Sequence, residues 1–560
     1  MRSHLRELLT RAIEKIARGG ELNSAELPPL LLEPPKQREF GDLSSNVAML
    51  WAKSAKKPPR VIAEMVLKNI EDPDGILARM EIAGPGFLNF TFAAEFYYAQ
   101  LRVLAAGEVG QLDLGHGEGM QVEFASVNPT GPLHVGHGRV AVIGDVLARL
   151  HEGTGYRVER EYYVNDAGNQ MDNLGLSIFA RYRELFGESV EFPAEGYPGD
   201  YVKEIAEAVK QREGDKYRNG DRQAAVDFFR EFGGASLLNT IRAQLKEFGV
   251  ELDGFFSEKS MRERSEVVKA MDFLRARGLL YSQDGAEWYK STQFGDDKDR
   301  AVIKSDGELT YFASDIAYHR NKYERQFHKL INVWGADHHG YVPRLKAAMQ
   351  GLGYDPDLLK VVLVQMVQLT RGGEPVRMGK RSGEFVPLQE VLEEVGRDAA
   401  RFFFLMRKSD SHLDFDLELA KKQSSDNPVF YVQYAHARVA SIFEQADKSG
   451  LQLGARDAVR VERLELPEES ELIRKMIQFD DVLGDSVREL EPHRMVFYLL
   501  DLAGEFHRYY NRHRVISDDV ELARARLLLI ENIQKTIRRG LELLGIGAPL
   551  KMAERLESGS

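Results

Sequence analysis

Two histidines separated by two residues give the sharpest chemical signal in the sequence: His134 and His137, in the segment NPTGPLHVGH at 128–137. A strand pattern precedes this segment and a helical pattern follows it. The start of a helix offers main-chain N–H groups and the positive end of the helix dipole to an anion. Gly136 lets a nucleotide approach the backbone closely. The segment therefore predicts a phosphate-binding site; the alternative is two surface histidines in a turn.

A second segment with similar potential is RGGEPVRMGKRSG at 371–383, which follows an apolar pattern at 360–369. We expect one strand over 360–369, and ligands of open α/β sheets bind at the C-terminal ends of strands. Arg377, Lys380 and Arg381 could neutralise the charge that builds on a triphosphate during displacement. A basic loop by itself is commonly only solvated, so the prediction depends on the two segments together.

Two acids are candidates for binding a cation. Glu123 lies in the strand pattern before His134, and Asp315 lies four residues after Tyr311, where a helix is expected to begin. A guanidinium has five donors and no acceptor, so a pocket for it needs planar acceptors and negative charge. From the residues alone, Glu123 could equally be an edge-strand carboxylate in water, and Asp315 an acid in the first turn of a helix.

Three further groups of residues are less specific. Asp337, His338 and His339 follow a strand pattern at 329–335, but we expect no metal there, because adjacent side chains of an extended segment point apart. Asn165, Asp166 and Gln170 end the second strand and open a helix, as a helix cap or as the rim of a pocket. The segment FHRYYNRHR at 506–514 combines three arginines, two histidines and three aromatics without an acid. Such a mixture suits unstacked bases, although the aromatic residues could instead belong to a helical core.

Composition limits the class of protein. A length of 560 residues with 43% hydrophobic and 29% charged residues fits a soluble protein of several domains and excludes collagen-like, disordered or disulfide-stapled chains. The net charge of −12 means that any nucleic-acid contact must come from local basic patches. The absence of cysteine excludes thiolate catalysis and cysteine-ligated metals. We expect a cytoplasmic protein without a membrane span, because helix 3–18 is amphipathic and the longest apolar run, at 360–369, is short.

The patterns predict a multidomain α/β protein with three domains. Residues 1–110 form a small α+β domain, in which Asp42 or Ser44 caps a helix. Residues 111–425 form a core with a Rossmann-like parallel sheet, split by a charged helical insertion at about 175–290. Further strands are expected at 300–304, 309–312 and 329–335. Residues 426–560 form an all-α domain with helices around 426–447, 468–486, 490–513 and 518–540.

Together the two segments resemble the HIGH and KMSKS signatures of class I aminoacyl-tRNA synthetases. HVGH at 134–137 matches the first, with Val for Ile. RMGKR at 377–381 matches the second less well: Arg377 replaces the first Lys, Gly and Arg replace the two Ser, and Lys380 keeps the second Lys. The resemblance narrows to the arginyl-tRNA synthetases through these segments, which occur in the family's order: FGDLSSNVAM, AGPGFLNF, VEFASVNPTGPLHVGHGR, YYVNDAGNQM, TYFASDIAYH, WGADHHGY and PVFYVQYAHAR. The resemblance as a whole extends from about residue 40 to 545.

The resemblance implies ATP-dependent attachment of L-arginine to tRNA(Arg) through an arginyl adenylate, with Mg²⁺ on the triphosphate rather than in a metal site of the protein. It also implies a monomer whose activation step needs tRNA, with the N-terminal module at the outer corner of the tRNA and the C-terminal domain on the anticodon stem and loop. The implied residues are, for catalysis, His134, His137 and Lys380; for ATP, those three with Pro129, Gly136, His339 and Met378; for arginine, Glu123, Asn128, Tyr311 and Asp315; for tRNA, Tyr431, Tyr434, Arg438, Arg508, Arg512 and Arg514.

Three alternative functions are to be weighed against this interpretation. A class I synthetase of different specificity is disfavoured by the two acids and Tyr311. A small-molecule nucleotidylyltransferase can share the histidine motif but has no need of the helical C-terminal domain. A non-catalytic RNA-binding paralogue is favoured only by the divergence around Arg377.

Overall fold

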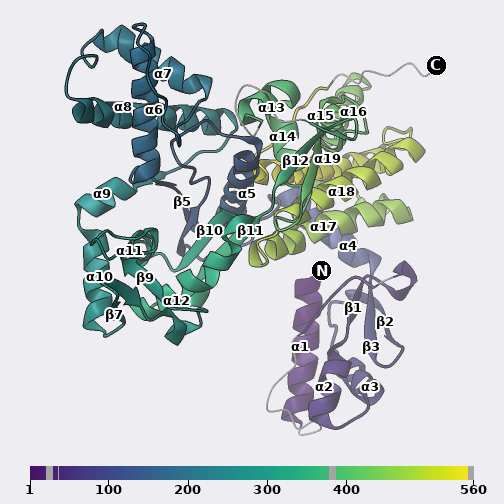
Figure 1. The fold of residues 1–560 in the computed structure, drawn as a ribbon. Coiled ribbons are helices and arrows are strands. Elements are labelled where there is room, and N and C mark those ends of the chain that lie inside the picture. Colours follow the sequence, from purple (N-terminus) through teal and green to yellow (C-terminus); the bar gives the residue numbers. More distant parts are fainter. Residues whose placement is uncertain (20–29, 36, 377–385, 553–560) are drawn as a thin grey trace.

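A parallel β-sheet forms the centre of the computed structural model, which describes residues 1–19, 30–35, 37–376 and 386–552 (Figure 1). Its strand order is β11-β10-β4-β5-β6, and all neighbours run parallel. The strands are β4 (Gly119–Glu123), β5 (Arg157–Val164), β6 (Gly254–Ser257), β10 (Lys329–Gly335) and β11 (Leu359–Val364). Residues 120–123 of the central strand β4 are all buried, as expected of a strand covered on both faces. The carboxyl ends of these strands define the edge where a ligand would bind.

Three helices connect these strands: α5 (Val135–Glu152), α11 (Tyr311–Glu324) and α12 (Val342–Leu352). Helix α5 is buried over most of its surface, because it packs against β5 and β10 on one side and against helices of the C-terminal half on another. It therefore begins at the ligand-binding edge and runs through the middle of the molecule.

Two units are inserted between β5 and β10. The first has its own hydrophobic core and stands away from the sheet in Figure 1: α6 (Asn169–Glu184), α7 (Asp200–Glu213) and α8 (Arg222–Glu247). The second contains α9 (Glu258–Glu263), α10 (Glu266–Ala276) and an antiparallel sheet of β7 (Leu280–Gln283), β8 (Ala286–Tyr289) and β9 (Arg300–Ile303). The prediction that 175–290 lies outside the sheet was wrong for Gly254–Ser257, since β6 pairs with β5. The expected strand at 300–304 belongs to the antiparallel sheet.

Two other strand predictions were also wrong. Residues 309–312 contain the start of α11, because Thr310 caps the helix by accepting a hydrogen bond from the N–H of Ala313. The expected single strand at 360–369 is two strands, β11 and β12 (Val367–Arg371). Strand β12 joins a separate small sheet with β13 (Glu374–Pro375) and β14 (Leu413–Asp416), next to α13 (Leu388–Val395), α14 (Arg397–Phe404) and α15 (Leu417–Lys421).

The N-terminal unit is a small α+β structure, shown in purple in Figure 1. It consists of α1 (Arg2–Arg18), β1 (Leu43–Ser45), α2 (Val47–Ala55), α3 (Pro59–Asn69), β2 (Leu77–Ala83), β3 (Phe87–Phe92) and α4 (Ala94–Ala106), with antiparallel strands in the order β1-β3-β2. The predicted caps Asp42 and Ser44 were wrong: Asn46 precedes α2, and Asp42 accepts a hydrogen bond from the N–H of Phe92.

The C-terminal part is helical, as predicted: α16 (Pro428–Lys448), α17 (Pro467–Arg488), α18 (His493–Arg512) and α19 (Val520–Leu543). The N-terminal unit rests on these helices. Arg2 Nη1 lies 2.6 Å from Asp485 Oδ2, and the Tyr98 hydroxyl donates to the Leu464 carbonyl at 3.0 Å. The predicted fold class is confirmed: a parallel-sheet core, a small α+β unit and an all-α unit.

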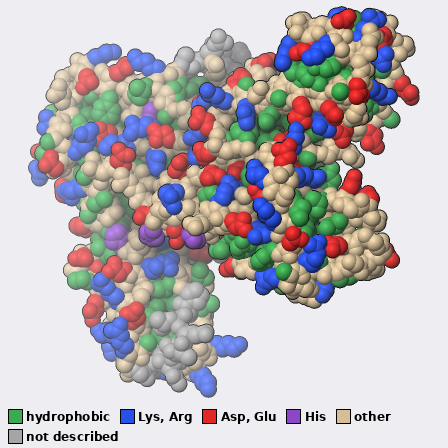
Figure 2. Space-filling view, turned by 90° about the vertical axis from the view of Figure 1, so that its left-hand side faces the viewer, with side chains coloured by type: hydrophobic (Ala, Val, Ile, Leu, Met, Phe, Trp, Pro, Cys, Tyr) green, Lys and Arg blue, Asp and Glu red, His purple; other side chains and the backbone are tan. Residues whose placement is uncertain are grey.

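The surface carries both signs of charge. In Figure 2, Lys and Arg side chains are interspersed with Asp and Glu over the face that is shown, as the modest negative net charge leads one to expect. Among the described helices, none combines the length and the apolar character that crossing a lipid bilayer requires.

Candidate functional site

The two histidines of the HVGH motif are held by the first turn of α5. His134 is the N-cap, and its Nδ1 accepts hydrogen bonds from the main-chain N–H groups of Gly136 and His137, at 3.1 and 3.3 Å. His137 Nδ1 accepts from the main-chain N–H of His134 at 3.3 Å. The rings stack with their centroids 3.3 Å apart. The motif therefore builds a reciprocal helix cap out of two imidazoles.

These contacts fix the protonation of both rings. Burial lowers the pKa of His134 to about 4. Burial, together with the neighbouring His134, lowers the pKa of His137 to about 3. Both rings are therefore neutral at physiological pH, and because each Nδ1 is an acceptor, each proton resides on Nε2. The start of α5 thus presents two uncharged N–H donors beside the positive end of the helix dipole, which suits a phosphate.

The same turn is bonded to the residues that follow the second predicted segment. The N–H of Val135 donates to the Val386 carbonyl at 3.1 Å, and the N–H of Leu388 donates to the Leu133 carbonyl at 2.9 Å. The predicted residues Arg377, Met378, Lys380 and Arg381 lie outside the described residues. The described chain resumes at Val386, which is bonded to the histidine turn.

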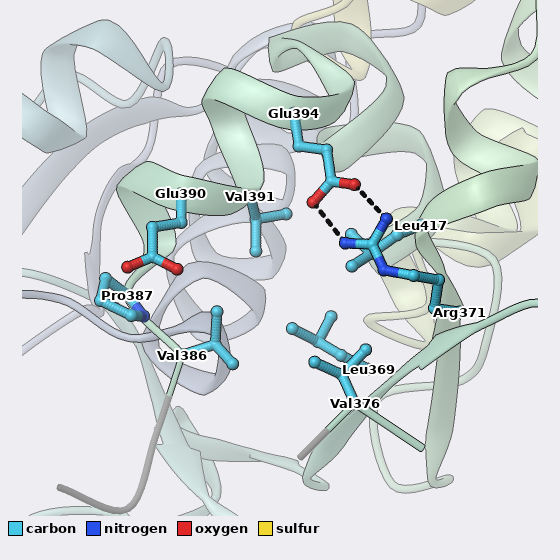
Figure 3. A pocket seen from close by; sticks show the side chains of 9 residues that line it. All are labelled: Leu369, Arg371, Val376, Val386, Pro387, Glu390, Val391, Glu394 and Leu417. Carbon is cyan, nitrogen blue, oxygen red and sulfur yellow. Dashed lines mark hydrogen bonds and ion pairs between the residues drawn. The ribbon is translucent and has the colours of Figure 1, made fainter. Parts of the chain in front are cut away.

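A cavity of about 120 Å³ lies between β12, the segment at 386–387 and the helices α13 and α15 (Figure 3). Leu369 and Val376 form one apolar wall, and Val386 and Val391 form another. Beside it, the Arg371 guanidinium binds the Glu394 carboxylate with two hydrogen bonds, of 2.6 and 2.9 Å. This pair ties β12 to α13.

The two predicted guanidinium-binding acids lie at the carboxyl edge of the sheet. Glu123 is the last residue of β4 and is 4% exposed. Its Oε2 lies 2.8 Å from Nζ of the fully buried Lys322, and its Oε1 accepts from the Ser126 hydroxyl at 2.9 Å. Asp315 lies in the second turn of α11 and accepts a hydrogen bond from the Tyr341 hydroxyl. The position of Glu123 in the central strand excludes the alternative of an edge-strand carboxylate in water.

Asp315 has an unusual charge environment. Burial raises its pKa to about 7; the negative charges of Glu258 and Glu123 add to this rise, while the Tyr341 hydrogen bond and Lys322 oppose it. A buried carboxyl group that titrates near neutrality is well suited to a cation that carries several donors. Tyr311, at the start of α11 and one helical turn before Asp315, is 59% exposed.

The other predicted residues of the core lie around this edge. Asn128 Nδ2 donates a hydrogen bond to Gln170 Oε1 at 2.5 Å. The next residue, Pro129, is buried. Asp166 accepts from the Ser257 hydroxyl at 2.6 Å and from the Lys259 N–H at 2.8 Å, so it caps α9 and not α6, the helix that follows it.

His339 is exposed in a short 3₁₀ helix, Ala336–Tyr341. The expectation of an extended segment there was wrong. Because His338 and His339 lie in this 3₁₀ helix, the argument that adjacent side chains of an extended segment point apart does not apply to them.

The predicted tRNA-binding residues fall on α16 and around the end of α18. The Arg438 guanidinium donates to the Tyr434 hydroxyl at 2.8 Å and lies 4.8 Å from the Tyr510 ring centroid, so the two helices share one face. Tyr431 is half-buried, and Arg508, Arg512 and Arg514 are exposed. Phe506 and Tyr509, in contrast, are buried core residues, which agrees with the alternative prediction that the aromatic residues of this segment belong to a helical core.

Two residues at the edge of the sheet were missed by the sequence analysis: Lys322 and Tyr341. Lys322 follows Asp315 by two helical turns, so the two residues lie on the same face of the expected helix. A lysine on the face that carries Asp315 was the signal that the sequence offered. Tyr341 carried no signal, because its approach to Asp315 depends on how η3 (Ala336–Tyr341) folds against α11.

Comparison with known proteins shows similarity along the whole chain. Three family models match: "Arginyl tRNA synthetase N terminal domain" at 3–92, "tRNA synthetases class I (R), catalytic domain" at 101–416, and "DALR anticodon binding domain" at 432–552. The arginine–tRNA ligase of Geobacter sp. (strain M21) is 49% identical over 99% of this chain and 100% of its own. That of Moorella thermoacetica is 46% identical over 97% and 98%. The solved structure of Thermus thermophilus arginyl-tRNA synthetase, 22% identical, shares the fold with a TM-score of 0.78, over 99% of this chain and 100% of that one.

Proposed function

The chain belongs to the arginyl-tRNA synthetase family and uses ATP to attach arginine to tRNA through an arginyl adenylate, and on that premise we propose which of its residues do the work. For the activation step we propose His134, His137 and Lys380. The observation that carries this proposal is the pair of neutral imidazoles at the start of α5, bonded to the segment that follows residues 377–385.

The chemistry needs positioning and charge stabilisation more than a nucleophile from the protein. A carboxylate oxygen of arginine forms a bond to the α-phosphorus of ATP, and the bond from that phosphorus to the β-phosphate oxygen breaks, which releases pyrophosphate. His134 and His137 donate hydrogen bonds from Nε2 to the phosphate oxygens, and Lys380 supplies positive charge. Pro129, Gly136, His339 and Met378 complete the ATP site. Mg²⁺ enters with ATP, because the triphosphate supplies the oxygen ligands that Mg²⁺ prefers.

The amino acid is recognised at the carboxyl edge of the sheet. Asp315 and Tyr311 contact the guanidinium of arginine, and Glu123 adds negative charge from β4. Asn128 holds the α-amino or carboxylate end of the substrate. Neutral analogues are rejected, because they would leave buried charges unpaired.

The tRNA spans the helical part and the N-terminal unit. Tyr431, Tyr434, Arg438, Arg508, Arg512 and Arg514 contact the anticodon stem and loop, and the N-terminal unit contacts the outer corner. We assign the domains to 1–110, 111–425 (with the insertion at about 175–290) and 426–560. The enzyme acts as a monomer in the cytoplasm.

Charging of total tRNA by the purified chain tests this assignment. ATP, Mg²⁺ and labelled amino acids are supplied, with one amino acid in each reaction, and we expect arginine alone to be attached. Loss of arginine attachment in Lys380→Ala, with tRNA binding retained, would support the role of Lys380, whereas full activity of that variant would remove it.

A further inference from the structure

Arg139, two residues after His137 on α5, is a fully buried cation whose hydrogen bonds go to the main chain. Its Nη1 donates to the carbonyls of Gln365 and Ser411, both at 2.8 Å, and its Nη2 donates to the carbonyl of Lys408 at 3.0 Å. Its Nε is buried without a partner in the described part of the chain.

Such a placement is unfavourable for a charged group. Removal of a guanidinium from water is compensated best by a carboxylate, and three carbonyl dipoles compensate it less. Burial lowers the pKa of Arg139 to about 10, so the side chain is still a cation at physiological pH. An apolar residue would fill the same space without this cost. The reason for a cation here therefore lies in the segments to which the three carbonyls belong.

All three carbonyls lie on segments that set the position of β12. Gln365 lies between β11 and β12, and its N–H donates to the Ser409 carbonyl at 2.8 Å. Lys408 and Ser411 belong to the turn between α14 and β14, and β14 runs parallel to β12. Arg139 therefore connects the helix that carries both histidines with the strand that leads to residues 377–385.

The other end of that stretch is already fixed, by the two main-chain hydrogen bonds between Leu133–Val135 and Val386–Leu388. We infer that Arg139 is a positioning residue for the activation step: it holds β12, the strand that precedes the proposed Lys380 in the sequence, in register with the His134–His137 pair. This inference rests on the proposed roles of those three residues. It adds a residue that contacts neither ATP nor arginine but sets the geometry in which they react.

The test compares Arg139→Lys with Arg401→Lys. Arg401 is also fully buried and also contacts α5, through Asp145, but its carbonyl contacts are with Leu544 and Phe248, away from the site. Charging kinetics are measured with ATP varied and with arginine and tRNA saturating, well below the melting temperature of each variant. We expect kcat/KM for ATP to fall about 10²-fold in Arg139→Lys, since a displacement of about 1 Å has an effect of that size. Arg401→Lys should lose stability while KM for ATP stays within twofold.

Equal effects of the two variants on the ATP parameters, or unchanged parameters in Arg139→Lys, would overturn the inference. A measurement on the wild-type protein keeps the inference testable even if Arg139→Lys does not fold. In hydrogen exchange, ATP should slow exchange in the peptides that cover 134–139, 365–371 and 407–412 together, and protection of the first peptide alone would contradict the inference. Failure of the wild type to charge tRNA with arginine would overturn the proposed function instead, so the two failures are distinguishable.

Discussion

The ammonium group of Lys322 lies 2.8 Å from the carboxylate of Glu123, although one residue is on helix α11 and the other ends strand β4. Lys322 also donates to Asn332 Oδ1 at 2.9 Å. An internal ammonium group is therefore paired with Glu123 at the carboxyl edge of the sheet, which limits the charge that Glu123 could offer to a substrate.

Replacement of Lys322 by Met should destabilise the protein by about 3–5 kcal/mol, because Glu123 would remain buried without a counter-ion. The double variant Lys322→Met/Glu123→Gln should recover most of that loss, since neither charge is then left alone. Urea unfolding of both variants and of Glu123→Gln completes a double-mutant cycle. A single lysine variant as stable as the double variant would show that the pair is not coupled.

Replacement of His134 by Asn should reduce kcat for charging by about 10²–10³-fold, the usual effect of removing one donor to a developing charge. Asn can still cap α5, so the helix start should survive. His151→Gln is the matched control, because His151 is a fully buried histidine on the same helix, far from its first turn. Steady-state charging assays should show the loss in the first variant only.

Arginine binding should depend on pH through Asp315. Its pKa of about 7 means that the empty pocket is protonated below neutrality and must release that proton to bind a guanidinium. Affinity should therefore rise with pH and level off above 7, and should be about tenfold weaker at pH 6 than at pH 8. Calorimetry in buffers of different ionisation enthalpy should report release of about half a proton at pH 7.

The groups that face Asp315 supply the control for this prediction. The Tyr341 hydroxyl lowers the pKa of Asp315, so Tyr341→Phe should move the midpoint of the affinity profile to higher pH. Among the other groups that face Asp315, Lys322 also lowers its pKa, whereas Glu258 and Glu123 raise it. A profile that does not move in Tyr341→Phe would mean that another group titrates.

Replacement of Gly144 by Ala should destabilise the protein by about 1–3 kcal/mol, the range for an overpacked core. A Cβ at this position of α5 would collide with the Cβ and the ring of the buried Phe124, next to Glu123. Gly504→Ala, also within a helix, meets its nearest atom at 3.5 Å and should gain up to about 1 kcal/mol from helix propensity. Thermal melting of the two variants should therefore shift in opposite directions.

Binding of tRNA should lose part of its salt dependence when Arg512 or Arg514 is replaced by Ala. Each phosphate contact that is lost should reduce the slope of log affinity against log salt by about 0.7–0.9. Arg275→Ala is the control, because Arg275 is exposed on α10 and paired with Asp272 and Glu287. Filter binding at several salt concentrations should separate the variants, and an unchanged slope in the first two would remove these residues from the interface.

The sequence was most informative where one local signal decides the structure. The helices of the C-terminal part follow from apolar residues at helical spacing, and the helix that starts at His134 follows from a glycine-rich motif between a strand and a helix. The apolar residues at 309–312 misled the prediction, because the Thr310 cap outweighs a strand-like composition. The run at 360–369 gives no sign of its break at Gln365, whose N–H bonds to Ser409, a residue distant in sequence.

Long-range pairing explains what remained hidden at the candidate site. The contacts of Glu123 with Lys322, and of Asp315 with Tyr341, join elements that are brought together only by the order of strands in the sheet. The pattern at each position identifies an acid in an unusual place but does not identify its partner.

The uncharged state of the two histidines has a consequence for the end of the reaction. Pyrophosphate is a highly charged leaving group, and an imidazolium pair would retain it by ion pairing after the bond to the α-phosphorus has broken. On the roles proposed for His134 and His137, neutral Nε2–H donors would orient the phosphates but hold them less tightly. Because main-chain N–H groups occupy both Nδ1 atoms, neither ring can acquire a second proton without losing part of the helix cap. On those proposed roles, the first turn of α5 would favour rapid departure of the first product, and with it repeated turnover.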